Sequence, residues 1–360
     1  MRKESSLMRK MQEYVVKGKK IFVGLEDSKR TWKVCVRNEG MVVDEVSMPA
    51  KYEVLRAYFR NKFPECEIRL MYEAGFQGFW LHDLLEEDRI DCIVTPSNKV
   101  TCEKDNRVKT DKRDARRLAK NLENGDYVSC HIPDRERRED RQISRTMSQI
   151  QKDITATKNR IRRFLDYHGL NYGLKDGEWT DKNYFNLRDL DISRSLKISL
   201  AASLNVLEGL LRNKKELSEE LHALCEKGKY KYGVTKKMSA PGIGWLTAIR
   251  MTLEFGEMSR FKTGKHIASY TGLTSREYST GDTIRRGRIT AQSSELLRSW
   301  LIEVAWRAIR KDPVLLEKFQ NVWRNSGSKK KAVVAVARKI AVRLWALETT
   351  GLPYCIGVIE

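Results

Sequence analysis

The residues best suited to chemistry are four carboxylates in the first third of the chain. Glu26 and Glu73 each end a predicted strand. Asp111 and Asp114 lie three residues apart in KTDKRDARRLA, where a helix would place both on one face. Clustered carboxylates repel one another, so a bound cation is their natural counterpart. Oxygen ligands suit Mg²⁺ or Mn²⁺, and two such ions can activate a nucleophile and stabilise the leaving oxygen in phosphodiester cleavage.

Alternatives stay open for each of these residues. Asp27 follows Glu26 directly, but strand alternation aims it at the other face of the sheet, so we favour Glu26. A single surface carboxylate is most often only solvated, and the hypothesis therefore depends on the whole set. Basic residues surround the helical pair and suit either bound phosphates or ordinary ion pairs. They are Lys109, Lys112, Arg113, Arg116 and Arg117.

A second candidate motif lies in the segment SAPGIG (239–244), which is followed by WLTAIR. It resembles the turn of a helix-hairpin-helix. Gly242 and Gly244 would let the backbone approach a DNA phosphate, and the following helix would offer free N–H groups. A plain turn before a helix is the alternative.

The acidic residues must be positioned by the elements around them. Short runs of β-branched and apolar residues predict strands at 21–26, 32–37, 41–48, 67–73 and 90–95. Helices are predicted at 50–62, 77–87 and about 111–123. Three strands in a meander, then helix–strand–helix–strand, is the element order of an RNase H-like sheet. We therefore expect an α/β domain at 20–125, with the first three strands antiparallel and the later ones parallel to the first.

Helices are predicted for most of the remaining chain. A heptad seam with 4-3-4-3-4-3 spacing is formed by Ile143, Met147, Ile150, Ile154, Thr157, Ile161 and Phe164. A leucine-rich run over 200–224 could pair with it, within the chain or between chains, as a coiled-coil connector at 135–230. Two ordinary bundle helices are the alternative. A mainly α-helical C-terminal domain is expected at 236–350, with helices near 245–255, 263–271, 292–310 and 330–347.

The composition favours a nucleic-acid partner. The 360 residues include 69 Lys and Arg against 48 Asp and Glu, a formal net charge of +21. So much positive charge repels itself unless a polyanion shares the surface, and DNA or RNA is the first candidate. A basic enzyme with an unrelated substrate is the alternative.

The sequence argues against several other classes of protein. The seven Cys lack a C-x-x-C pair and the five His are dispersed, which argues against a zinc ribbon, a disulfide scaffold or a His-based metal site. No apolar run is long enough to span a membrane. The N-terminus lacks the apolar segment of a signal peptide. We therefore expect a cytoplasmic or nucleoid-associated protein.

Three segments, GLEDSKRTW, MYEAG and VKTDKRDARRLA, resemble the DEDD transposases of the insertion-sequence one-ten family. The resemblance covers nearly the whole chain and implies a RuvC-like catalytic domain followed by a serine-bearing transposase domain. It implies that Glu26, Glu73, Asp111 and Asp114 are the catalytic metal ligands. The first position is usually Asp in the family, whereas this chain has the longer Glu26.

The segment from Phe261 to Trp306 resembles the serine-bearing domain of the same family. The resemblance implies that a Ser beside a Gly attacks DNA and holds it as a covalent phosphoserine. Ser279 is the candidate nucleophile, with Thr280 as the alternate because it stands directly before Gly281. The stretch AQSS (291–294) replaces a more usual Lys-x-Gly-Asn. Candidate phosphate clamps are Arg285, Arg286, Arg288 and Arg298.

The function implied by the resemblance is transposition of an insertion sequence by cutting and rejoining DNA. One acidic site and one serine per chain cannot exchange four strands alone, so a homo-oligomer, a dimer or tetramer, is expected. The family also implies a structured guide RNA, the bridge RNA. One rival is a metal-dependent nuclease or junction resolvase that never rejoins DNA. Another is a non-catalytic nucleic-acid-binding relic of a transposase.

Overall fold

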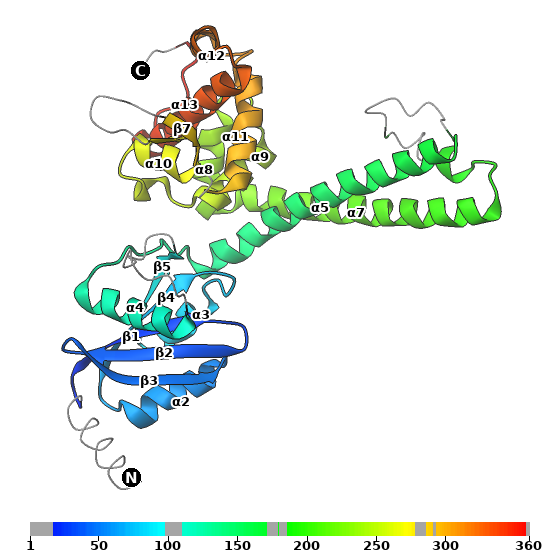
Figure 1. The fold of residues 1–360 in the computed structure, drawn as a ribbon. Helices are drawn as coiled ribbons and strands as arrows, with labels where there is room; N and C mark the ends of the chain where they lie inside the picture. Colours follow the sequence, from blue (N-terminus) through cyan, green and yellow to red (C-terminus); the bar gives the residue numbers. More distant parts are fainter. Residues whose placement is uncertain are drawn as a thin grey trace. The chain divides into compact units, whose positions relative to one another are not determined.

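The structure is a computed structural model that describes residues 17–97, 110–170, 179, 186–277, 286–290 and 293–357 (Figure 1). The chain divides into two compact units, Met1–Ile132 and Pro133–Glu360. Within the described ranges, no helix is long and apolar enough to cross a membrane.

The first unit is built on a five-stranded sheet with the order β3-β2-β1-β4-β5. β1 pairs antiparallel with β2, and β2 with β3, whereas β4 pairs parallel with both β1 and β5. The predicted strand directions are therefore confirmed. The strands are β1 (Lys20–Asp27), β2 (Thr31–Asn38), β3 (Met41–Pro49), β4 (Glu67–Ala74) and β5 (Asp91–Pro96).

Helices cover both faces of this sheet. α2 (Tyr52–Lys62) and α3 (Trp80–Glu87) share one core with Val23 and Leu25 of β1. α4 (Asp111–Asn124) covers the other face, where its Leu118 and Leu122 pack with Met71 of β4. Successive strand residues point to opposite faces, so the sequence divides each strand between the two cores. The first unit is an α/β domain, as predicted.

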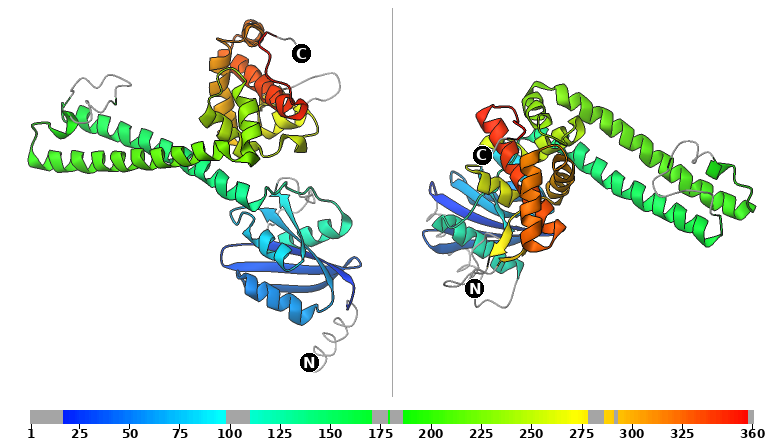
Figure 2. Two further views of the ribbon diagram at one scale, coloured as in Figure 1. Left: turned by 180° about the vertical axis from the view of Figure 1, so that it is seen from behind. Right: turned by 90° about the horizontal axis from the view of Figure 1, so that it is seen from above.

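The second unit begins with two long helices, α5 (Arg135–Tyr167) and α7 (Arg194–Glu226), which run side by side (Figures 1 and 2). Ile154 and Ile161 of the predicted seam are buried against Leu200, Leu204 and Leu207. The two runs therefore pair within one chain. Apolar residues at 4-3 spacing face a single partner because each turn of a helix advances by about 3.6 residues.

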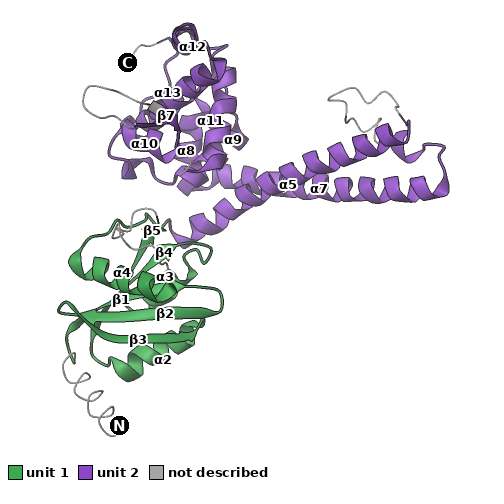
Figure 3. Ribbon diagram, in the orientation of Figure 1, with its two compact units in different colours: residues 1–132 green, residues 133–360 purple. Residues whose placement is uncertain are grey.

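The N-terminal part of α5 and the C-terminal part of α7 share a hydrophobic core with the C-terminal helices. Met147, Leu221 and Leu224 are buried with Phe255 and Leu301 in one cluster. This shared core explains why a single compact unit extends from residue 133 to the C-terminus (Figure 3).

The C-terminal region is mainly helical, as predicted. Its helices are α8 (Gly228–Met238), α9 (Trp245–Phe255), η2 (Met258–Arg260), α10 (Gly264–Tyr270), α11 (Glu295–Ala308), α12 (Pro313–Ser326) and α13 (Lys329–Thr350). Two short strands, β6 (Ser275–Glu277) and β7 (Arg286–Ile289), pair antiparallel. α8, α12 and this strand pair were not predicted.

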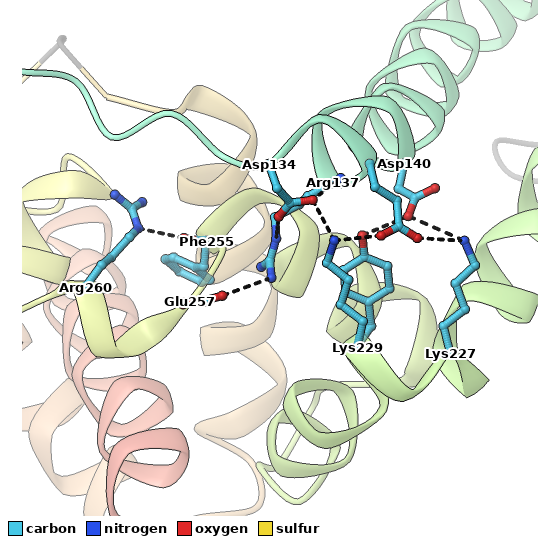
Figure 4. Close-up of polar contacts among 10 residues, drawn as sticks. Asp134, Arg137, Asp140, Lys227, Lys229, Phe255, Glu257 and Arg260 are labelled. Carbon is cyan, nitrogen blue, oxygen red and sulfur yellow. Dashed lines mark hydrogen bonds and ion pairs between the residues drawn. The ribbon is translucent and has the colours of Figure 1, made fainter. Parts of the chain in front are cut away.

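Ion pairs fix the first turns of α5 to the C-terminal helices (Figure 4). Lys229 of α8 donates to Asp134, the N-cap of α5, at 2.6 Å. Arg137 pairs with Asp134 at 3.5 Å and approaches Glu257 at 3.9 Å. Arg137 is buried, whereas Asp134 and Glu257 are half-exposed or exposed, so each of these pairs contributes little on its own.

Candidate active site

The carboxyl ends of β1 and β4 place two of the predicted carboxylates side by side. The parallel register pairs Leu25 with Tyr72, and Glu26 and Glu73 are the next residue of each strand. Both lie on the face covered by α4, because Gly24 and Met71, two residues earlier, contact that helix.

Close approach of α4 to β1 depends on Gly24. A Cβ atom there would lie 2.1 Å from the backbone oxygen of Ala115 and 2.4 Å from the backbone nitrogen of Ala119. Only glycine therefore allows the helix to lie at this distance from the strand.

The first turn of α4 supplies the other two carboxylates. Thr110 caps the helix, with its side chain accepting from the Arg113 amide. Asp111 is exposed at the first position of the helix, whereas Asp114 is only 5% exposed. Asp114 lies one turn before Leu118, on the side of the helix that faces the sheet.

The electrostatics of Glu26 link all four residues. Its pKa is raised to about 7, first by burial and then by the charges of Asp114, Glu73, Asp27 and Asp111. Like charges disfavour ionisation over short distances, so the direction of this shift agrees with carboxylates lying near one another. The structure therefore brings the four predicted residues to one end of the sheet.

One arginine neutralises part of this cluster. Arg117 Nη2 lies 2.9 Å from Glu73 and 3.0 Å from Asp114. Two neighbouring cations, Lys112 and Arg116, pair instead with Glu45 of β3. Of the basic residues noted around Asp111 and Asp114, Arg117 is thus a direct partner of a candidate ligand.

The donor set fits a hard divalent cation. Asp114 Oδ2 is buried and has no hydrogen-bond partner. Thr95 Oγ1 is also buried without a hydrogen-bond partner. Thr95 pairs in register with Glu73, and its hydroxyl was missed because a lone Thr at a strand end carries no sequence signal. In the described part of the chain, however, no three His, Cys, Asp or Glu side chains stand in metal-binding geometry. An oxygen-only set next to an unpartnered buried carboxylate oxygen is nevertheless of the kind that hard divalent cations prefer.

Asp27 lies on the opposite face of β1 from Glu26, as alternation requires. It shares that face with Leu25, in the core formed with α2 and α3. Its side chain is buried, and its pKa is raised to about 6, chiefly by that burial.

The raised pKa of Glu26 predicts a pH-dependent stability for the metal-free protein. The unfolded chain loses this proton near pH 4.5 and the folded chain near pH 7, so folding becomes less favourable between these values. Glu26→Gln stays neutral, so we expect it to be more stable than wild type by roughly 1–3 kcal/mol above pH 7. Guanidinium unfolding near pH 5 and pH 8 measures the difference. Glu53→Gln, an exposed change on α2, is the control, and equal pH profiles for the two variants would contradict the prediction.

The two glycines of the SAPGIG turn have different surroundings. A Cβ at Gly242, where φ is +86°, would lie 2.8 Å from Arg307 Cβ and 3.2 Å from the Val304 oxygen. Gly242 therefore lets the turn pack on α11. Gly244 has open space around it and lines a cavity at the start of α9. Of the two, Gly244 has the open surroundings that approach to a phosphate needs.

The predicted serine region falls between β6 and β7 in the sequence. Ser279, Thr280 and Arg285 lie outside the described residues, and Arg286 is described only as part of β7. Arg288 is exposed on the same strand.

Arg298, by contrast, is engaged within the protein. It donates to the Thr290 oxygen at 3.1 Å and to Ser293 Oγ at 3.2 Å. Gly272 leaves room for this arrangement, because a Cβ there would lie 2.0 Å from Ser293 Oγ. Arg298 thus holds Thr290, directly after β7, and Ser293, just before α11.

Known proteins resemble both the acidic N-terminal region and the C-terminal region of this chain. Residues 23–169 match a family model for DEDD proteins of IS110 elements, described as Transposase. Residues 236–320 match a model described as Transposase IS116/IS110/IS902 family. The transposase for insertion sequence element IS1533 of Leptospira borgpetersenii is 23% identical, over 91% of this chain and 95% of its own length. The transposase for insertion sequence element IS1111A of Coxiella burnetii is 24% identical, over 80% and 79%. The similarity thus spans the acidic cluster and the serine region together.

Proposed function

Because the chain belongs to the IS110 family of transposases, we propose that it cuts and rejoins DNA as the recombinase of an insertion sequence. The acidic cluster is the metal-dependent site of this reaction, and Ser279 is the nucleophile. The observation that carries the proposal is the convergence of Glu26, Glu73 and Asp114 beneath the first turn of α4. In this scheme the first unit is an RNase H-like, RuvC-like domain, and α5 and α7 form a coiled-coil connector.

The acidic residues have distinct tasks in this proposal. Glu26, Glu73, Asp111 and Asp114 would hold Mg²⁺ or Mn²⁺, which when bound polarises phosphate oxygens and stabilises the leaving oxygen. Asp114 offers its unpartnered oxygen, and α4 fixes its position against the sheet. Arg117 contacts Glu73 and Asp114 and balances part of their charge.

The serine supplies the rejoining chemistry. Ser279 Oγ attacks a backbone phosphorus, forming the Oγ–P bond while the P–O bond to the neighbouring deoxyribose breaks. The hydroxyl proton passes to a base, and the leaving oxygen takes up a proton. Attack of another DNA hydroxyl on the phosphoserine reverses these steps and seals a strand without an external energy source. Arg285, Arg286 and Arg288 are the proposed phosphate clamps, and Arg298 positions the chain beside them.

The remaining partners are parts of the same proposal. DNA is the substrate, a structured guide RNA directs the choice of site, and a homo-oligomer brings two duplexes together. The net charge of +21 supports a polyanionic partner.

A covalent protein–DNA adduct tests the proposal. With labelled DNA and Mg²⁺, the wild type should yield a strand attached to the protein on a denaturing gel. Ser279→Ala should abolish the adduct, because the attacking oxygen is gone, whereas the matched variant Thr280→Ala should retain it. Loss in Thr280→Ala alone would make Thr280 the nucleophile. Cleavage without any adduct in the wild type would make the protein a nuclease.

A further inference from the structure

The seam between α5 and α9 in the second unit carries an unbalanced positive charge. Arg250 of α9 donates to Ser144 of α5 at 3.4 Å and also bonds Ser148. Arg145 of α5 reaches Glu254 of α9. Arg141 of α5 lies near Glu254 at the end of α9, whereas Gln151 lies near Trp245 at its start, so the two helices run antiparallel along this seam.

Five cations lie along the seam with two carboxylates. The cations are Arg141, Arg145, Arg250, Lys214 and Arg307, and the carboxylates are Glu254 and Glu303. Arg145 holds Glu254 through bonds of 2.6 and 3.0 Å, so that charge is balanced. Within the described residues the other four cations form no ion pair, and three positive charges remain in excess.

Arg141 is the least satisfied of these side chains. Its guanidinium is half-buried, and its Nε atom is buried without a hydrogen-bond partner. Burial lowers its pKa, and the neighbouring charge of Arg145 adds to this effect. A buried guanidinium nitrogen without a hydrogen-bond partner is costly even with the charge of Glu254 nearby, so an anion bound at Arg141 would lower this cost.

The other end of the seam opens into a cavity of about 480 Å³. Met147 and Gln151 of α5 and the first turn of α9 form part of its wall. Lys214, Arg250 and Arg307 supply positive charge, and Glu303 is the one acid among the lining residues. The interior therefore suits an anion bound between cations from three different helices.

The length of the seam favours a polymer over a small anion. Ten residues of α5 separate Arg141 from Gln151, a distance of about 15 Å along the helix. A single phosphate would satisfy one end alone, whereas a nucleic-acid strand presents phosphates at regular short intervals. Arg141 at one end and Lys214 and Arg307 at the other, for which the described residues supply no ion pair, are thus matched by one strand.

We propose that the α5–α9 seam is a phosphate-binding track for a nucleic-acid strand. One phosphate lies at Arg141 and another in the cavity between Lys214 and Arg307. This inference rests on the proposed function, because it takes nucleic acid as the partner, but it concerns binding and requires neither the metal nor the serine.

Fluorescence anisotropy of the full-length, metal-free protein tests the track. The probes are a mixed-sequence DNA duplex and a single-stranded RNA of equal length, each titrated at several KCl concentrations. Arg141→Gln and Arg307→Gln should each weaken binding by about fivefold to tenfold and reduce the slope of log K against log salt by about 0.9. Lys318→Gln, an exposed change of equal charge on α12, should leave both values unchanged.

Stability distinguishes a ligand site from a structural role. Arg141→Gln removes a desolvated cation, so its melting temperature should equal or exceed that of wild type, and Arg141→Lys should retain most of the binding. A lower melting temperature with unchanged affinity would overturn the proposal. Wild-type affinity in both Gln variants would also overturn it and leave the proposed function standing. A wild type that binds neither probe would refute both. Selective loss of one probe supports the track and identifies the strand.

Discussion

Asp114→Asn is expected to reduce metal-dependent DNA cleavage by about a hundredfold or more, since a bound metal supplies several kcal/mol of charge stabilisation. Asn has nearly the same shape but no charge, and its amide nitrogen cannot act as a ligand. Asp114 is 5% exposed and lies beside Glu26, Glu73 and Arg117, so loss of its charge removes one of the clustered carboxylates directly. Single-turnover cleavage of labelled DNA at saturating Mn²⁺ measures the loss.

The folded state should survive this substitution. Asp114→Asn removes one of the like charges that raise the pKa of Glu26, and Arg117 keeps Glu73 as a partner. We therefore expect an unchanged or higher melting temperature without metal, and weaker Mn²⁺ binding by calorimetry. Asp126→Asn, an exposed change just after α4, is the matched control and should cleave normally. Full activity in Asp114→Asn would remove Asp114 from the metal site.

The sheet and the acidic cluster could be predicted because they depend on local patterns. Period-two alternation fixes which face each strand residue takes, and this alone separates Glu26 from Asp27. The order of strands and helices then fixes the parallel pairing of β1 and β4, which places Glu26 beside Glu73.

The partners of these residues could not be predicted, because they are set by distant segments. Lys112 and Arg116 pair with Glu45, about seventy residues earlier on β3. Nothing in the basic sequence around α4 separates these two from Arg117, which faces the carboxylates. The position of each side chain around the helix decides its partner, and the packing of α4 on the sheet sets that position.

In the C-terminal region too, the sequence does not predict the contacts of individual glycines and arginines. Gly242 and Gly244 are equivalent in the sequence motif, yet one packs on α11 and the other opens into the cavity. The sequence does not show that the guanidinium of Arg298, a predicted phosphate clamp, also bonds the backbone oxygen of Thr290. α8 was missed because KYKYGVTKKM has few apolar residues, and its buried side includes Gly233 and Lys237.

Among Gly→Ala changes at the described glycines of the first unit, Gly24→Ala is expected to have the largest effect on stability. The new Cβ would meet backbone atoms of Ala115 and Ala119 at 2.1 and 2.4 Å, and backbone cannot turn aside as a flexible side chain can. α4 must therefore move away from β1, which opens the small-residue packing against Cys35. Overpacking of this kind costs about 3 kcal/mol, equivalent to a melting temperature lower by roughly 10 °C or more.

The same displacement should impair the acidic site, because α4 carries both Asp111 and Asp114. We expect Gly24→Ala to lose cleavage and Mn²⁺ binding even at temperatures where circular dichroism shows it folded. Gly209→Ala on α7, where a Cβ meets open space, should be neutral or stabilising by about 0.5–1 kcal/mol. If Gly24→Ala instead bound Mn²⁺ normally while losing stability, the position of α4 would not set the ligand geometry. The carboxylates of β1 and β4 would then suffice to hold the ion, and the requirement for a glycine at this point of the strand would be one of packing alone.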